Sequence, residues 1–344
     1  MKLEQSYYEN ICGAVYFPAR AYNAYQTFTM FDEKEFERDL GYAVSAGINA
    51  YRLFVSYHFY LENQERFFVI FDEMLQLADK YKVRIMPVLF EDCGVEFSEE
   101  SGNDRNPYTA VCVRYPGREI EHHRERFPEV LPYLDAFMER YRDDNRLLAI
   151  EIMNEPHREK GNVEFARYIA EHVYSIRGGI PLTMGCIMLE HNLYFADLLD
   201  IYQFHDNFPT SAEQFRNGLI AAKHVEQVVD KPCWITEWQR LREGDPGWGK
   251  ADIPEEYKVP KLSSLADIIH EVGIGSFFWS LMVKPAYLPE QRINGTINGL
   301  FHEDGSVFSA EDFRKVSGKD ECVQEYPMSP KWYQEDMHQL DKHL

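Results

Sequence analysis

The chain has 344 residues, of which 45% are hydrophobic, so it is long enough to bury a large core. Its formal net charge is −21. A surface this acidic repels phosphate groups, which argues against nucleic-acid binding and against docking on anionic membranes, whereas a neutral ligand is compatible with it.

Short apolar runs alternate with helical patterns along the chain. The expected strands are Ile11–Phe17, Ala50–Ser56, Val83–Phe90, Leu147–Met153, Pro181–Met188, Ile201–Phe204, Pro232–Thr236 and Ile274–Leu281. The expected helices between and after them are Asp32–Ala46, Arg66–Tyr81, Pro128–Tyr141, Val163–Ile176, Leu193–Leu199, Ala212–Val228, Leu262–Val272 and Ser309–Val316. Pro87 lies inside the third strand, where we expect a bulge or a strand end because proline lacks an N–H donor.

Eight strands that are each followed by a helix or a helical piece predict a single (β/α)8 TIM barrel, an α/β fold. The alternative is a doubly wound open sheet, which would normally show a Gly-rich phosphate loop after an early strand, and the sequence has none. We expect residues 1–344 to form one catalytic domain, with a hairpin and a helical tail after about residue 282. The irregular stretch Glu91–Arg126 predicts a long functional βα loop.

The six cysteines include no close CxxC pair, so neither a zinc site nor a disulfide framework is indicated. The N-terminal residues MKLEQSYYEN carry no apolar core of a signal peptide, and no apolar run of about 18 residues occurs. These observations predict a cytoplasmic protein that does not enter a membrane.

Polar and aromatic residues gather where the predicted strands end. In a (β/α)8 barrel the active site lies at the C-terminal ends of the strands, so these positions predict the functional rim. The candidates are Tyr16, Arg52, His58, Glu91, Asp92, Asn154, Glu155, His205, Asn207, Glu237, Trp238 and Trp279. His205 fits a buried core histidine nearly as well, and Glu91 and Asp92 fit either ligand contacts or solvated loop charges.

Glu155 and Glu237 end two different predicted strands. Two facing carboxyl groups can cleave a glycosidic bond, because one protonates the leaving oxygen while the other attacks the sugar carbon. A negative Glu237 nearby would raise the pKa of Glu155 and keep it protonated for the first step.

The triplet Asn154-Glu155-Pro156, together with Glu237, resembles the retaining glycoside hydrolases of clan A, and most of all the cellulase-like family five. The resemblance implies that Glu155 is the acid/base and Glu237 the nucleophile. It also implies supporting residues: Arg52 positions the nucleophile, Asn154 binds the sugar 2-hydroxyl, His205 is the strand-six histidine, and Trp279 is the floor of the sugar site.

Two positions depart from the family pattern. His205-Asp206-Asn207 stands where the family has His-x-Tyr, whose tyrosine bonds the nucleophile. Glu91-Asp92-Cys93 stands where the family has a histidine after strand three. These departures point to an outlying, β-mannosidase-like subfamily or a sister family, with its own substrate contacts.

The sequence therefore predicts a retaining β-glycosidase that acts on neutral β-linked oligosaccharides and needs no metal or organic cofactor. Exo action on β-mannosides is our first expectation, and a β-glucoside is the second sugar. Three rivals remain open: an endo-acting β-glucanase or β-mannanase, a catalytically inactive carbohydrate-binding barrel, and a metal-dependent barrel hydrolase. The oligomeric state is not indicated.

Overall fold

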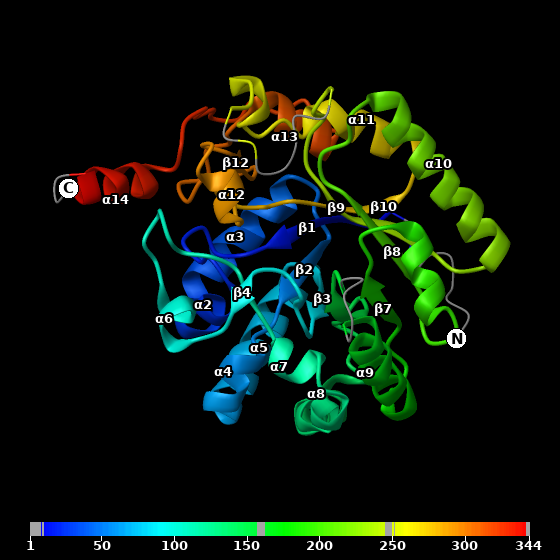
Figure 1. Ribbon diagram of the computed structural model, residues 1–344. Helices are drawn as coiled ribbons and strands as arrows, with labels where there is room; N and C mark the ends of the chain where they lie inside the picture. The colour runs from blue at the N-terminus through cyan, green and yellow to red at the C-terminus, as the bar shows by residue number, and fades with distance from the viewer. Residues whose placement is uncertain (1–7, 9, 157–161, 245–249, 251, 342–344) are drawn as a thin grey trace.

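A computed structural model describes residue 8 and residues 10–156, 162–244, 250 and 252–341 of the chain. Its centre is a sheet of eight parallel strands, surrounded by helices (Figure 1). The strands are β1 (Cys12–Tyr16), β2 (Ala50–Phe54), β3 (Arg84–Val88), β6 (Ile150–Asn154), β7 (Leu182–Gly185), β8 (Tyr202–Asp206), β9 (Cys233–Trp238) and β10 (Gly275–Phe278). Their order in the sheet is β7-β6-β3-β2-β1-β10-β9-β8.

The two outer strands of this order, β7 and β8, meet and bring the sheet nearly to a closed ring. Asp200 N–H donates to Leu182 O at 2.9 Å, and His205 N–H donates to Ile187 O at 3.3 Å. The side chain of Thr183 adds a hydrogen bond to Ile201 O at 3.0 Å. The fold is thus the predicted (β/α)8 barrel, in which all strand ends of one kind meet at one rim.

Helices follow the strands as the sequence periodicity predicts. The helices are α2 (Ala24–Thr29), α3 (Glu33–Ser45), α4 (Tyr57–Glu62), α5 (Gln64–Lys80), α6 (Glu99–Asn103), α7 (Arg118–Glu121), η1 (Arg124–Val130), α8 (Leu131–Tyr141), α9 (Asn162–Ile176), η2 (Leu189–Phe195), α10 (Ala212–Val229), η3 (Glu255–Tyr257), α11 (Ser263–Val272), α12 (Pro289–Arg292), α13 (Ala310–Ser317) and α14 (Lys331–Asp341). The short helices α2 and α4 were not predicted, and the helical piece expected at Leu193–Leu199 begins earlier, as η2.

Local chemistry fixes the ends of the longer helices. Asp32 and Ser211 cap α3 and α10, because their side chains accept from the N–H groups of the third residue onward. Asp230 and Gly273 end α10 and α11 in the left-handed conformation that terminates helices.

Pro87 lies inside β3, and a bulge accompanies it as expected. Ile85 N–H donates to Arg146 O, and Leu89 N–H donates to Glu151 O, so the strand opposite carries one extra residue over this interval. Proline has no N–H to continue the ladder, which explains why the register slips here.

The loop after β3 is more ordered than its composition predicts. It contains α6, α7 and the two-stranded sheet of β4 (Val95–Glu96) and β5 (Val113–Arg114). An antiparallel bridge between Glu91 and Tyr115 folds it back over the end of β3. The loop therefore forms one wall above the rim.

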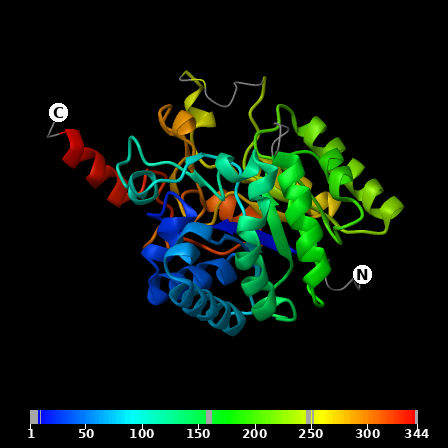
Figure 2. The same cartoon turned by 60° about the horizontal axis from the view of Figure 1, so that its bottom comes forward.

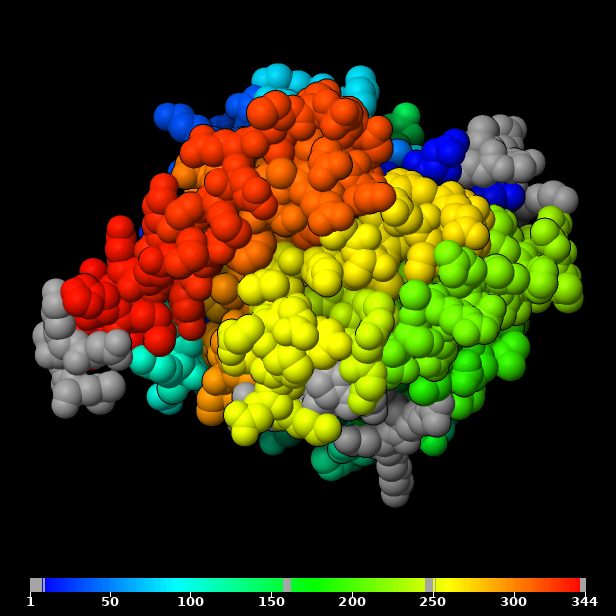
Figure 3. Space-filling model, turned by 90° about the horizontal axis from the view of Figure 1, so that it is seen from above, coloured from blue at the N-terminus to red at the C-terminus, as the bar shows by residue number. Residues whose placement is uncertain are grey.

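The chain after β10 adds β11 (Lys284–Pro285), β12 (Ile297–Asn298), α13 and α14. Phe301 pairs with Val307 across the predicted turn at Glu303-Asp304-Gly305. The segments after β9 lie side by side on the face seen in Figure 3, and α14 projects from the body in two views (Figures 1 and 2). The assignment of residues 1–344 to one domain remains a prediction.

No helix within the described ranges combines the length and apolar character needed to cross a lipid bilayer.

Candidate active site

A buried guanidinium organises the centre of the rim. Arg52, on β2, donates from Nη1 to Glu237 Oε1 at 2.7 Å, and from Nε to Glu151 Oε2 at 2.7 Å. Its Nη2 donates to Asn154 Oδ1 at 2.6 Å and also reaches Glu151. Arg52 is fully enclosed, so its charge is compensated by two carboxylates rather than by water.

Gly185, at the end of β7, makes room for this network. A Cβ atom at this position would lie 2.2 Å from Glu151 Oε1 and 3.1 Å from Arg52 Nη2. A larger residue would therefore push the ion pair out of place.

Glu155 follows β6 with a φ of 43°, in the left-handed region that non-glycine residues seldom adopt. Its N–H donates to Gly185 O at 2.7 Å, which holds this turn. The carboxyl group has two side-chain neighbours: His205 Nδ1 lies 2.6 Å from Oε1, and the Cys93 thiol donates to Oε2 at 3.1 Å. Such strained residues cluster at functional sites, where surrounding contacts hold them.

Glu237, on β9, is only 6% exposed. Besides Arg52, it accepts from Asn207 Nδ2 at 2.8 Å, and His205 Nδ1 lies 3.7 Å from its Oε2. One carboxylate oxygen from each of Glu155 and Glu237 and a ring nitrogen of His205 all lie within 4.8 Å of one another. The two glutamates thus face each other across a short gap but have different partners.

Two groups beside this pair have shifted pKa values. Burial lowers the pKa of His205, but the charge of Glu237 and the hydrogen bond to Glu155 outweigh it, and the net pKa is raised. Burial raises the pKa of Glu91 well above its ordinary value; hydrogen bonds from Asn154 and Cys93 oppose this, and the charges of Glu155 and Glu237 add to it.

The glutamates open into a pocket of about 480 Å³ at the C-terminal ends of the strands. Its lining combines one tryptophan, neutral amides and the carboxyl groups, namely Glu91, Cys93, Asn154, Glu155, Asn207, Glu237, Gln239, Trp279, Tyr287, Leu288, Gln291 and Asn298. A ring face together with several amides suits a ligand that carries C–H groups and hydroxyls.

Four of the predicted rim residues lie away from this pocket. The hydroxyl of Tyr16 donates to Asp39 of α3 at 3.0 Å, so Tyr16 faces the surrounding helices rather than the barrel interior. The ring of His58 stacks on Phe97 with centroids 3.9 Å apart, and its burial lowers its pKa to about 4.

The other two are Asp92 and Trp238. Asp92 forms an ion pair with Arg118 and accepts from Asn162 Nδ2 at 2.6 Å, behind the pocket wall. Trp238 packs its ring on Phe278, with centroids 6.0 Å apart. The expectation that Tyr16, His58, Asp92 and Trp238 line the site is therefore wrong, and each serves packing or loop structure instead.

Some site residues escaped the sequence analysis. Glu151 had a detectable signal, because a lone carboxylate inside the apolar strand LLAIEIMN needs a buried partner. Cys93, Gln239, Tyr287, Gln291 and Asn298 had none, because they reach the pocket through loop paths that periodicity does not encode.

The spacing of Glu155, His205 and Glu237 would admit a metal ion, and theirs is the one such group among the residues that the structure describes. The 2.6 Å contact of His205 Nδ1 with Glu155 Oε1 already engages two of those donor atoms. Chemistry without a metal stays our prediction, and chelation tests it below.

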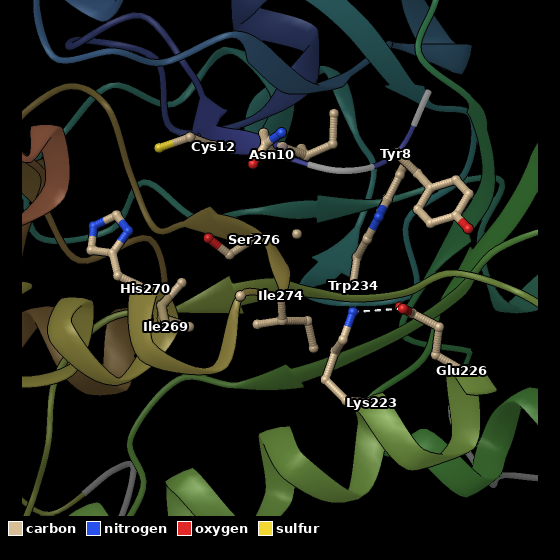
Figure 4. Close-up of a pocket in the computed structure, with 13 residues that line it drawn as sticks. Tyr8, Asn10, Cys12, Lys223, Glu226, Trp234, Ile269, His270, Ile274 and Ser276 are labelled. Carbon is tan, nitrogen blue, oxygen red and sulfur yellow. Dashed lines mark hydrogen bonds and ion pairs between the residues drawn. The ribbon is translucent and has the colours of Figure 1, made fainter. Parts of the chain in front are cut away.

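A larger hollow, of about 950 Å³, lies at the opposite end of the strands (Figure 4). Its acidic residue, Glu226, pairs with Lys223 at 2.5 Å and accepts from Cys233 N–H at 3.1 Å. Because that carboxylate is neutralised and no second one joins it in the lining, we place the candidate active site at the glutamate pair instead.

Comparison with known proteins identifies the fold. No protein-family model matches the chain, and no curated protein sequence matches it. Among solved structures, it resembles the exo-β-1,4-mannosidase Op5Man5 from Opitutaceae bacterium strain TAV5, with a TM-score of 0.65 and 14% identity over 92% of this chain and 62% of that one. The present chain thus spans about three fifths of the length of Op5Man5.

Two further solved structures match over most of both chains. A glycoside hydrolase family 5 mannosidase from Rhizomucor miehei has a TM-score of 0.59 and 14% identity over 98% of this chain and 95% of its own. An endo-1,4-β-mannanase from the same organism has a TM-score of 0.55 and 14% identity, over 88% and 93%. At this identity the likeness establishes the barrel fold that these proteins share.

Proposed function

We propose that this protein is a retaining β-glycosidase in which Glu155 is the acid/base and Glu237 the nucleophile. The observation that carries the proposal is the facing pair of carboxyl groups, with oxygens no more than 4.8 Å apart. Retaining enzymes need a short separation of about 5–5.5 Å between the carboxyl groups, whereas inverting enzymes leave room for a water molecule between them.

The unequal partners of the two glutamates support their separate roles. Arg52 and Asn207 both donate to Glu237, which favours its ionised form for attack on the anomeric carbon. Glu155 is held by His205 and Cys93 instead and receives no guanidinium contact among those described. It would first give its proton to the leaving oxygen and then, once Glu237 is esterified, take a proton from the attacking water.

The remaining pocket residues would bind the sugar. Trp279 offers a ring face for the sugar C–H groups, and Asn154 keeps one Nδ2 hydrogen for the 2-hydroxyl after donating the other to Glu91. Asn207 would take over the support of the nucleophile that a tyrosine gives in family five, since it donates to Glu237 at 2.8 Å.

We infer exo action on β-mannosides. The support is the small pocket, walled by the loop after β3 and by Leu288 and Gln291 around α12, together with the fold shared with two mannosidases. The shared fold with an endo-mannanase keeps endo action as the second candidate.

The test is a panel of aryl β-glycosides and short β-linked oligosaccharides, run on wild type and on Glu237→Ala. We expect the variant to lose at least about 10⁴-fold in kcat and to regain part of it with azide or formate, which replace the missing carboxylate. Glu213→Ala, an exposed position on α10, is the control and should match wild type.

Three outcomes would contradict parts of the proposal. A fully active Glu237→Ala variant would remove the assignment of the nucleophile. A wild type inactive on every glycoside that it binds would favour the inactive sugar-binding barrel, and loss of activity with a chelator would favour the metal-dependent reading. Release of mixed oligomers rather than single sugars would establish endo action.

A further inference from the structure

Glu91 brings a third carboxyl group into the pocket. It follows β3 directly, is 1% exposed, and lines the pocket with Glu155 and Glu237. Its backbone is fixed on two sides by bridges to Tyr115 and Asn154. The proposed double displacement uses two carboxyl groups, so this one has no role in it.

The two hydrogen bonds to the Glu91 side chain converge on one of its oxygens. Asn154 Nδ2 donates to Oε1 at 2.9 Å, and Cys93 N–H donates to the same atom at 2.7 Å. These donors use both lone pairs of Oε1, as they would for the carbonyl oxygen of an un-ionised acid. Oε2 has no hydrogen-bond partner within the described part of the chain.

The surrounding charges favour the protonated acid. Burial raises the pKa of Glu91 well above its ordinary range, and the charges of Glu155 and Glu237 add to this against the two hydrogen bonds. Arg52, the guanidinium of the site, already contacts Glu151 and Glu237. A second ionised carboxylate beside Glu237 would thus lack a counter-ion, whereas a neutral acid presents an O–H donor.

We propose that Glu91 is a specificity-determining residue, a neutral carboxylic acid whose Oε2–H donates to one hydroxyl of the sugar that lies against Trp279. The inference rests on the proposed function and names what this glycosidase would select: a neutral pyranoside with a free hydroxyl at the position facing β3. A site built to hydrogen-bond a hydroxyl rejects the analogue that lacks it, because its own polar group is then left unpaired.

The test combines two variants with a set of aryl β-glycosides, each lacking one ring hydroxyl. Glu91→Gln keeps a neutral side chain with an acceptor and a donor, so we expect kcat/KM within about tenfold of wild type. Glu91→Ala should lose about 100-fold on the parent glycoside, but at least tenfold less on the one deoxy glycoside that lacks the contacted hydroxyl. Glu100→Ala, an exposed carboxylate in the same loop, is the control and should show neither effect.

The results separate this proposal from the broader one. If wild type hydrolyses the parent glycoside but Glu91→Ala loses the same factor on every deoxy analogue, Glu91 merely holds Asn154, and the glycosidase assignment survives. An inactive Glu91→Gln variant with the thermal stability of wild type would likewise overturn the neutral-donor role. A wild type that hydrolyses no glycoside overturns both proposals.

Discussion

His205 Nδ1 lies 2.6 Å from Oε1 of Glu155 and 3.7 Å from Oε2 of Glu237, so one imidazole stands between the two carboxyl groups of the site. A proton on this ring would be attracted by both glutamates. The position of the ring thereby couples the ionisation of the two groups, which coupled carboxyl pairs report as properties of the whole cluster.

The stability that His205 contributes should depend on pH. Its folded-state pKa is raised, despite the opposing effect of burial, by the charge of Glu237 and the contact with Glu155. The contribution is then fully present below the unfolded pKa of about 6.5 and is lost as pH rises through the higher folded value. We expect urea unfolding to show a larger gap between wild type and His205→Gln at about pH 6 than at about pH 9. A gap that does not change with pH would contradict this.

Arg52→Met should destabilise the protein strongly, because it leaves Glu151 and Glu237 buried without their shared cation. We expect a loss of about 3–5 kcal/mol in the free energy of unfolding. Arg216→Met breaks the exposed pair with Glu271 and should cost at most about 1 kcal/mol. Denaturant titrations of both variants make the comparison; equal effects would mean that the buried network adds no stability.

Gly185→Ala should disturb the same network by steric contact. The new Cβ would lie 2.2 Å from Glu151 Oε1, so we expect a loss of about 1–3 kcal/mol in stability and a clear fall in kcat. Gly218→Ala is the matched control, since its Cβ meets nothing within 4 Å and lies in α10, where alanine is favoured by up to about 1 kcal/mol. Thermal melts and steady-state kinetics would measure both, and a neutral Gly185→Ala would show that the ion pair can shift freely.

Lys284 offers a second pH test outside the catalytic pair. Its buried ammonium donates to Pro18 O and Ala21 O, and burial, reinforced by repulsion from Arg292, lowers its pKa to about 7. Between about pH 7 and pH 10 the unfolded chain holds a proton that the folded chain has lost, so this group makes stability rise with pH by about 1 kcal/mol per unit.

Lys284→Met removes that titration. The free energy of unfolding of the variant should therefore rise less, or fall more, than that of wild type between about pH 7.5 and pH 9.5. Parallel pH profiles for the two proteins would show that Lys284 stays charged in the folded state.

The strands and most long helices could be predicted because their burial pattern is written in the local sequence. The expected strand Ala50–Ser56 contains β2, and the expected helix Ala212–Val228 matches α10 to within one residue. Short helices such as α4 depend on tertiary contacts, since isolated helices of this length are not stable.

Prediction of the site was less complete, because the end of a strand identifies a rim position but not the face that a side chain takes. The pairing of β1 with β2 aligns Val15 with Arg52 and Tyr16 with Leu53. Side chains alternate along a strand, so Tyr16 and Arg52 point to opposite sides of the barrel wall. Knowing which residue of β1 pairs with Arg52 would have excluded Tyr16, but that register is a property of the assembled sheet.

The anchoring of Glu237 through Arg52 to Glu151 has a consequence for protein engineering. These three residues stand on strands β2, β6 and β9, whereas Gln291 and Leu288, which close the pocket, belong to the segment around α12. The reactive carboxylate is thus aligned from within the scaffold, independently of the walls that meet the ligand. Loop exchange around α12 should accordingly retarget the enzyme to other ligands without realignment of its nucleophile.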